Sequence, residues 1–260
     1  MRRSLVVVSL VLLLTGCFEI EQSINIEKDL SGTADFHLGI DMEPMVIIMA
    51  QVGKEMEGKG GVLTAAEIAK AKAEFKKSSK TTESGPAQAF DRAEVEKELP
   101  KGIKLLDFKA TEKEFGVATD FKFAFDRINH LVDVKFPSKE GGGDPTKKSI
   151  IDSPFEGLEV IEKGNLITIQ TKPQNPTESV KEQAAEGPKM DAATEKMMED
   201  AFGKLRVVYR LTAPFTIVSH NAMRKEGNTL IWEYDIKKFK ELEKKGQKMD
   251  DAGVKVVYRR

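Results

Sequence analysis

The stretch EIEQSINIEKDLSGTADFHLGI, residues 19–40, decides how this 260-residue chain starts to fold. Apolar and polar residues alternate on both sides of a polar turn, which is the pattern of an antiparallel hairpin with one buried face. The alternating apolar residues are Ile20, Ile24 and Ile26 before the turn and Phe36, Leu38 and Ile40 after it. The turn, at residues 29–32, has the Asp, Ser and Gly residues that favour a tight reversal. The sequence therefore predicts a β-hairpin here.

A helix is predicted directly after this hairpin. Asp41 precedes a segment whose apolar residues recur at three- and four-residue spacing, and Pro44 falls in the first turn, where its missing N–H costs little. The apolar residues are Met42, Met45, Val46, Met49, Val52 and Met56. We expect this methionine stripe to be part of the core; the alternative is an adaptable wall for an acyl chain or a partner helix.

The same order of elements recurs along the chain. A strand that ends in aspartate and leads into a helix occurs again at 121–128 and 231–236, so Asp41, Asp126 and Asp235 are predicted N-caps. Helices at 93–99 and 192–202 each end near a glycine that leads into a strand, as a left-handed C-cap allows. Further strands are predicted at 155–161, 164–170 and 253–259, and the last of these resembles 203–209 in sequence. An internal duplication and a coincidence both remain open.

These patterns predict an α+β fold after a cleaved signal peptide. We expect one or more antiparallel sheets with helices packed on one face, built from repeated ββα and αββα units. Segments 78–89, 138–148 and 171–189 lack apolar periodicity and are predicted to be mobile insertions. The expected domain covers residues 17–260; the alternative is two halves, 17–170 and 191–260, joined by a flexible 171–190 segment.

Residues 1–16 have the composition of an export signal. Arg2 and Arg3 precede an apolar run, Leu5–Leu14, of about ten residues, which is the length of a signal-peptide core and too short to span a bilayer. The run ends in LTGC, residues 14–17, which resembles the lipobox of bacterial lipoproteins. The resemblance implies cleavage before Cys17, a diacylglycerol thioether on its sulfur and, usually, a further acyl chain such as palmitate on the new amino terminus. The alternatives are an ordinary secretory leader and a cytosolic protein with a buried thiol.

A lipid on Cys17 has consequences for location and chemistry. Two or more acyl chains hold a protein at a bilayer, whereas one does so only marginally. The expected location is therefore the cell envelope, outside the cytoplasm. Because Phe18 and Glu19 follow the cysteine, the aspartate that marks inner-membrane retention in enteric bacteria is absent, which favours the periplasmic face of an outer membrane. Cys17 is also the only cysteine, so its acylation leaves no thiol for disulfides or thiolate catalysis.

The sequence predicts no catalytic, cofactor or metal site, and the only predicted site residue is Cys17. His37, His130 and His220 each lack a second ligand at metal-binding spacing. A set of Ser219, His220 and Asp235 lacks the glycine-flanked elbow that exposes a nucleophile.

Two further patterns restrict the choice of ligand. The glycine clusters at 58–61 and 141–143 lack phosphate-binding register. Basic residues are spread among acidic ones at a net charge of −1, so no nucleic-acid partner is expected. Trp232, Tyr209 and Tyr258 are expected to be packing residues.

The mature chain resembles the domain family named after the mycobacterial lipoprotein LppM. Members follow the lipidated cysteine with a strand, a turn of the Asp-x-Ser-Gly type and an outgoing strand, which Ile24–Asp41 matches. Near the C-terminus they have a proline, an Asn-Ala-like turn and a tryptophan strand. The matching residues are Pro214, Asn221-Ala222 and Leu230-Ile231-Trp232, although Phe215 replaces the usual glycine. The resemblance implies an anchored envelope protein without an assigned catalytic site, and it transfers no functional residue beyond Cys17.

The leading hypothesis is a non-catalytic envelope lipoprotein that binds a partner protein, an envelope lipid or a cell-wall component near the membrane. One alternative is a lipid carrier, with an apolar cavity between the sheet and Met45 and Met49. Another is a hydrolase of envelope polymers that acts through two carboxylates.

Overall fold

The computed structural model describes residues 18–81, 91–136, 154–171, 206–235, 237–238, 241 and 253–260. The leader with Cys17, the helix predicted at 192–202 and most of the three predicted insertions lie outside these residues. The described part has a mixed α+β fold, as the sequence analysis predicted, with two sheets, three α-helices and a 3-10 helix.

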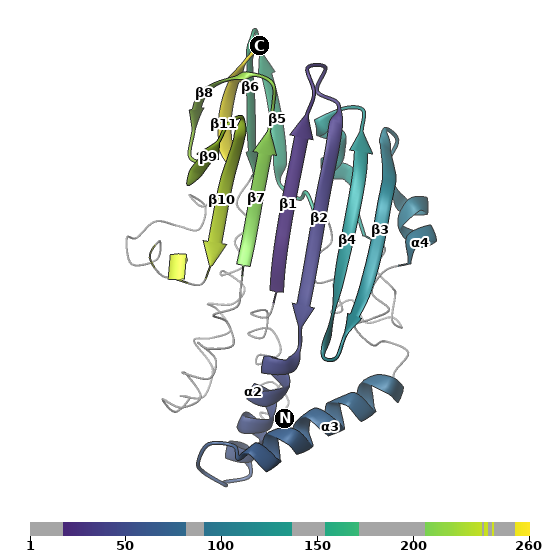
Figure 1. The fold of residues 1–260 in the computed structure, drawn as a ribbon, viewed down its shortest axis with the longest axis vertical. Helices are drawn as coiled ribbons and strands as arrows, with labels where there is room; N and C mark the ends of the chain where they lie inside the picture. The colour runs from purple at the N-terminus through teal and green to yellow at the C-terminus, as the bar shows by residue number, and fades with distance from the viewer. Residues whose placement is uncertain are drawn as a thin grey trace, which may run out of the picture.

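The large sheet has seven strands in the order β3-β4-β2-β1-β7-β10-β9 (Figure 1). Its strands are β1 (Phe18–Ile26), β2 (Gly32–Asp41), β3 (Ile103–Lys113), β4 (Gly116–Phe125), β7 (Arg206–Thr212), β9 (Arg224–Glu226) and β10 (Thr229–Asp235). The predicted first hairpin is confirmed, since β1 and β2 pair in register from Phe18 opposite Ile40 to Ile26 opposite Gly32. Asp29 Oδ1 accepts hydrogen bonds from the backbone N–H (3.0 Å) and hydroxyl (2.6 Å) of Ser31, which stabilise the turn.

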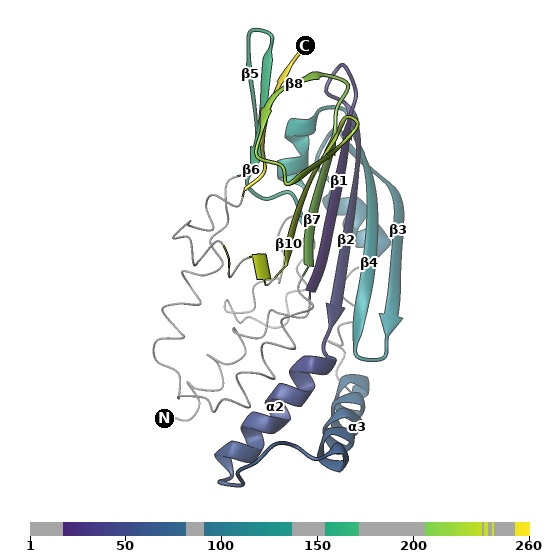
Figure 2. The ribbon, with the colours of Figure 1, turned by 60° about the vertical axis from the view of Figure 1, so that its left-hand side comes forward.

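The small sheet has the order β5-β6-β11-β8 and lies against one face of the large sheet (Figure 2). Its strands are β5 (Leu158–Lys163), β6 (Leu166–Thr171), β8 (Thr216–His220) and β11 (Lys255–Arg259). Ile167, Val256 and Tyr258 of this sheet belong to one core with Phe36 and Trp232 of the large sheet. The core is thus mainly a sheet-on-sheet interface, in which the alternate residues of both sheets interdigitate.

Aromatic rings fill this core beside β2 and β4. Phe36, Phe121 and Phe136 lie with ring centroids 4.6–6.1 Å apart, and Phe155 lies 6.4 Å from Phe36. The side-chain amide of Gln22, also buried, donates to the backbone carbonyl of Pro154. The segment that enters β5 is therefore bound to the large sheet by both packing and a hydrogen bond.

The described strand pairs are antiparallel, as predicted, except for one pair. β1 and β7 pair in parallel, from Glu19 opposite Arg206 to Asn25 opposite Thr212, because the chain returns to the sheet after a long connection rather than a hairpin. β6 also pairs with β11. Strands from both 17–170 and 191–260 therefore belong to both sheets.

The repeated units are not apparent in the described elements. β7 and β11 resemble each other in sequence but lie in different sheets. β7 lies between β1 and β10 in the large sheet, and β11 lies between β6 and β8 in the small sheet. Of the three predicted aspartate caps, Asp235 is confirmed, since its carboxylate accepts from Lys238 N at 2.7 Å. Asp41 accepts from Glu43 N at 3.0 Å, but the N-cap of α2 is Met42, so Asp41 lies one residue before the cap. Asp126 is not a cap, because its carboxylate contacts the ring of His130 at 2.6 Å instead.

The helices are α2 (Glu43–Met56), α3 (Ala65–Thr81), α4 (Arg92–Glu98) and the 3-10 helix η2 (Ile128–Asp133). Helix α3 was not predicted from the sequence. Helices α2 and α3 form a hairpin beyond one end of the large sheet rather than a layer over its face (Figures 1 and 2). The expectation that the methionine stripe is core was therefore wrong for its outer half: Met49 and Met56 are 46% and 57% exposed.

Candidate functional site

The face of the large sheet opposite the small sheet is polar. Residues alternate between the two faces of a strand, so those between the core residues all point to this side. The charged residues on it include Glu19 and Glu21 of β1, Asp35 and His37 of β2, Asp107 of β3, Asp120 and Lys122 of β4, Arg206 and Arg210 of β7, and Glu233 of β10. In the part of the chain that the structure describes, this is the largest set of interacting charged side chains.

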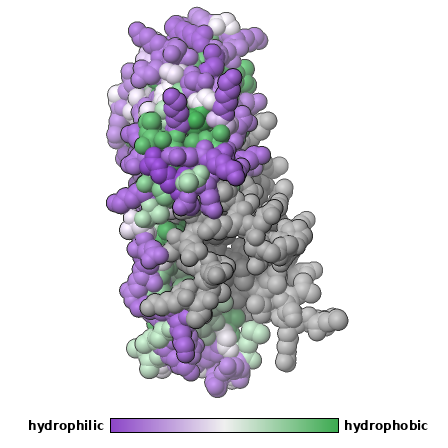
Figure 3. All heavy atoms as spheres, turned by 90° about the vertical axis from the view of Figure 1, so that its right-hand side faces the viewer, coloured by the Kyte–Doolittle hydropathy of each residue, from purple (hydrophilic) through white to green (hydrophobic). Residues whose placement is uncertain are grey.

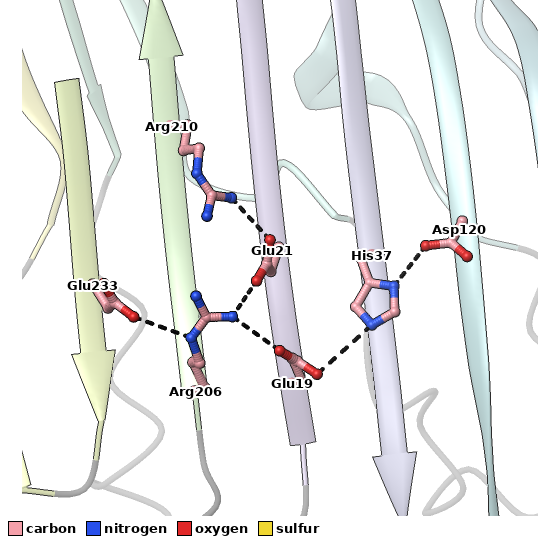
Figure 4. Close-up of polar contacts among 7 residues, drawn as sticks. All are labelled: Glu19, Glu21, His37, Asp120, Arg206, Arg210 and Glu233. Carbon is pink, nitrogen blue, oxygen red and sulfur yellow. Dashed lines mark hydrogen bonds and ion pairs between the residues drawn. The ribbon is translucent and has the colours of Figure 1, made fainter. Parts of the chain in front are cut away.

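Arg206 is the centre of this face (Figure 4). The parallel register of β1 and β7 brings its guanidinium to Glu19, at 2.9 Å from Oε1, and to Glu21. Its Nε donates to Glu233 Oε1 on the opposite neighbour, β10, at 3.0 Å. Arg210 donates to the second oxygen of Glu21 at 2.8 Å. Two arginines and three carboxylates thus connect three adjacent strands.

The charges in this network stabilise one another. Partial burial raises the pKa of Glu21, but hydrogen bonds and attraction from Arg210 and Arg206 outweigh this effect, and the net pKa lies below its usual value. For Arg206, burial lowers the pKa, while the hydrogen bonds to Glu233, Glu21 and Glu19 raise it by more. Both groups are consequently charged at neutral pH.

His37 extends the network towards β4. Its Nδ1 lies 2.6 Å from Asp120 Oδ1, and its Nε2 lies 4.0 Å from Glu19 Oε2 (Figure 4). The imidazole therefore lies between two carboxylates on neighbouring strands. These two contacts fix the orientation of the ring between the strands.

A hollow of about 300 Å³ lies beside this histidine. Its polar lining consists of Glu21, Ser23, Asp35, His37, Asp107, Asp120 and Lys122. The lining has four carboxylates and one lysine. Lys122 Nζ lies 3.5 Å from Asp35 Oδ1, so the carboxylates remain in excess. The chemistry of this lining suits a cationic or hydrogen-bond-donating group. Among the described residues, no group of three or more His, Cys, Asp or Glu side chains is arranged to hold a metal ion.

The structure separates the other candidate residues. His130 contacts Asp126, and His220 Nδ1 accepts from the backbone N–H of Ala222 at 3.1 Å. Asp235 caps the turn at Lys238. The set of Ser219, His220 and Asp235 is thus not brought together among the described contacts. Cys17, the predicted lipid site, lies outside the described residues and directly precedes the first residue of β1.

The side chain of Asn221, which the sequence indicated only as part of a turn, makes three hydrogen bonds. Its Oδ1 accepts from Trp232 Nε1 and from Lys255 N, both at 2.8 Å, and its Nδ2 donates to Gly253 O at 2.6 Å. Trp232 itself is fully buried, as expected for a packing residue. The turn after β8 therefore connects the large sheet at β10 with the start of β11 in the small sheet.

The network around Arg206 was not predicted from the sequence. Directly paired members are separated by up to 189 residues in sequence, and no local motif marks them. The sequence indicated only part of this network: the alternation of apolar and polar residues in β1 places Glu19 and Glu21 on the face opposite the isoleucines. Their cationic partners on β7 follow only from the strand order.

Comparison with known proteins gives little beyond this geometry. No family model matches the sequence, and no curated protein matches it. Among solved structures, the chain is similar to the folded domain of LppM from Mycobacterium tuberculosis, determined by NMR. The TM-score is 0.41 at 10% sequence identity, over 94% of this chain and 90% of that chain. LppM is the protein after which the family noted in the sequence analysis is named, but a likeness of this size carries no information on function.

Proposed function

We propose that this protein is a lipid-anchored envelope lipoprotein, cut before Cys17, whose α+β domain is a non-catalytic binding or scaffold module outside the cytoplasm. The observation that carries the proposal is the order of residues 1–17: two arginines, an apolar run of about ten residues, and LTGC with the only cysteine of the chain. The outer-membrane periplasmic face is the proposed location where the cell has two membranes.

The structure of the domain is compatible with this arrangement. Its first strand starts at Phe18, directly after the proposed lipid site, so no linker would separate the lipid from the sheet. None of the helices in the described part of the chain is both long and apolar enough to cross a bilayer.

The proposed binding surface is the polar face of the large sheet. It is broad, it contains the hollow beside His37, and its ion pairs hold the side chains in fixed positions across β10, β7, β1, β2 and β4. A partner with cationic or hydrogen-bond-donating groups would complement the carboxylates there.

The anchor is tested by metabolic labelling with palmitate and by the mass of the mature protein. Wild type is expected to incorporate the label and to have an acylated Cys17 as its first residue. Cys17→Ser is expected to remain uncleaved or unlabelled, whereas Gly16→Ala, which keeps a small residue in the lipobox, should still be processed. Equal labelling of Cys17→Ser and wild type would overturn the proposal.

The binding role is tested by native mass spectrometry of protein extracted from its own membrane. A co-purifying protein that is lost in an Asp35→Asn, Asp120→Asn variant supports the binding module. A retained lipid in place of a protein would favour the carrier instead, and turnover of an envelope polymer by the purified protein would contradict a non-catalytic role.

A further inference from the structure

The α2–α3 hairpin lies at the end of the sheet where the mature chain begins. Phe18, the residue after Cys17, pairs with Ile40, and α2 starts three residues after Ile40. Phe18, the residue that follows Cys17 in sequence, is therefore at the same end of the sheet as the start of α2. Both ribbon views place α2 and α3 beyond the same end of the strands (Figures 1 and 2).

The base of the hairpin is attached firmly to the sheet. Met42 N donates to Phe115 O in the β3–β4 turn at 2.7 Å, and the rings of Phe75 on α3 and Phe115 stack at 6.2 Å. Lys76 pairs with Glu114 in the same turn. These contacts set the direction of both helices relative to the strands.

The tip of the hairpin also has a defined geometry. The buried side chain of Gln51 accepts from Leu63 N at 3.0 Å and donates to Gly61 O at 3.2 Å. Lys54 donates to Val62 O at 3.2 Å and pairs with Glu67 at 3.0 Å. The loop between the helices is therefore held in place, and its exposed side chains are held with it.

Three of the eight large hydrophobic side chains that are exposed in the described part of the chain lie on this hairpin. Met49 and Met56 are seven residues apart and so lie on one side of α2, and Val62, in the tip loop, is 58% exposed. Figure 3 shows pale green, apolar residues among hydrophilic ones at this lower end. Residues 43–81 contain seven lysines and five glutamates, a net charge of +2 in a chain whose net charge is −1.

We infer that the α2–α3 hairpin is a membrane-contacting surface, which lays Met49, Met56 and Val62 into the interface of the bilayer that holds the Cys17 acyl chains. The inference rests on the proposed lipid anchor, because the anchor brings this end of the sheet to the membrane. Burial of the exposed half in the bilayer would favour the membrane-bound orientation of the hairpin roughly fivefold for each of these side chains. The positive charge of the hairpin suits an anionic lipid surface.

Site-specific labelling of the mature, acylated protein tests the inference. Because Cys17 is the only cysteine and its sulfur would be a thioether, a thiol-reactive, polarity-sensitive fluorophore should not label wild type. Val62→Cys places the probe at the tip, and Lys28→Cys places it in the exposed β1–β2 turn at the opposite end of the sheet. The proteins are reconstituted into vesicles of phosphatidylethanolamine and phosphatidylglycerol, with or without bromine on the acyl chains near the headgroup.

The expected result is a blue shift and a loss of fluorescence with brominated lipid for the Val62→Cys probe and neither change for the Lys28→Cys probe. Adding Met49→Gln and Met56→Gln should reduce the quenching at the tip. Equal, unquenched spectra at both positions would overturn the inference and leave the anchor standing. A blue shift without quenching would mean that a second copy of the chain, not lipid, covers the hairpin, which also overturns the inference. Labelling of wild type would instead disprove the acylation of Cys17 and with it the proposed function.

Discussion

Replacing Arg206 with methionine removes a charge that serves three carboxylates and retains an apolar stem of similar length. The guanidinium contacts Glu19, Glu21 and Glu233, and its side chain is 36% exposed. A single exposed ion pair contributes about 0.2–1 kcal/mol. The three ion pairs of Arg206 share one planar guanidinium, so they should contribute more together than one pair does. Glu21 keeps its contact with Arg210 in the variant, which limits the loss. We therefore expect the free energy of unfolding to fall by about 1–2 kcal/mol at pH 7.

The pH dependence of this effect follows from the pKa of Glu21. The folded-state pKa lies below the ordinary value of 4.5, so its contribution to stability is complete above that value and is lost as the pH falls through the folded-state pKa. The difference between wild type and Arg206→Met should therefore shrink on acidification. High salt should also reduce it, because the groups are partly exposed.

Urea unfolding of both proteins, followed by the fluorescence of Trp232, at several pH values and salt concentrations measures these differences. Arg224→Met is the matched control, because Arg224 in the same sheet is 57% exposed and pairs with a single carboxylate, Glu226. It should change stability by less than about 0.5 kcal/mol. The reasoning would be refuted if both variants lost the same stability, or if the loss in Arg206→Met were independent of pH and salt.

Three further predictions concern the rest of the fold. Gly116→Ala should destabilise the protein by about 2–4 kcal/mol in urea unfolding, because its Cβ would lie 1.9 Å from the carbonyl oxygen of Ile40. Asn221→Ala should cost about 1–3 kcal/mol and shift the emission of Trp232, whose indole N–H loses its acceptor. Burial raises the pKa of all three tyrosines, and that of Tyr234 to about 12. In a spectrophotometric titration the folded protein should therefore show no tyrosine ionisation near pH 10. The free energy of unfolding should fall as the pH rises from about 10 through the folded-state pKa values.

The controls for these variants lie in the same chain. Gly60→Ala adds a Cβ that meets no atom within 4 Å and should leave stability nearly unchanged. Asn221→Asp keeps the acceptor for Trp232 and should retain more stability than Asn221→Ala. Tyrosine ionisation of the folded protein at pH 10 would contradict the burial of these side chains.

Local patterns predicted the elements whose partners lie nearby in sequence. The first hairpin and the β5–β6 hairpin were predicted because alternation and turn residues specify both strands and their reversal. The periodicity of residues 42–56 correctly predicted a helix. It could not show that the helix extends past the sheet, because an apolar stripe does not specify which surface, if any, packs against it.

Features that depend on distant pairing were not predictable in this way. The parallel contact of β1 with β7, and with it the Arg206 network, joins residues more than 180 positions apart. Nothing in the separate strand sequences indicates which edges meet. The lipid site is the opposite case: Cys17 is predicted from contiguous residues alone, and it stays a prediction.

The strand β11 has a consequence for when the domain can finish folding. This last strand, residues 255–259, lies between β6 and β8 and is the only link between them in the small sheet. Until residues 255–259 have been synthesised and have left the ribosome, β6 and β8 have no strand between them to pair with, so the small sheet cannot close over the core.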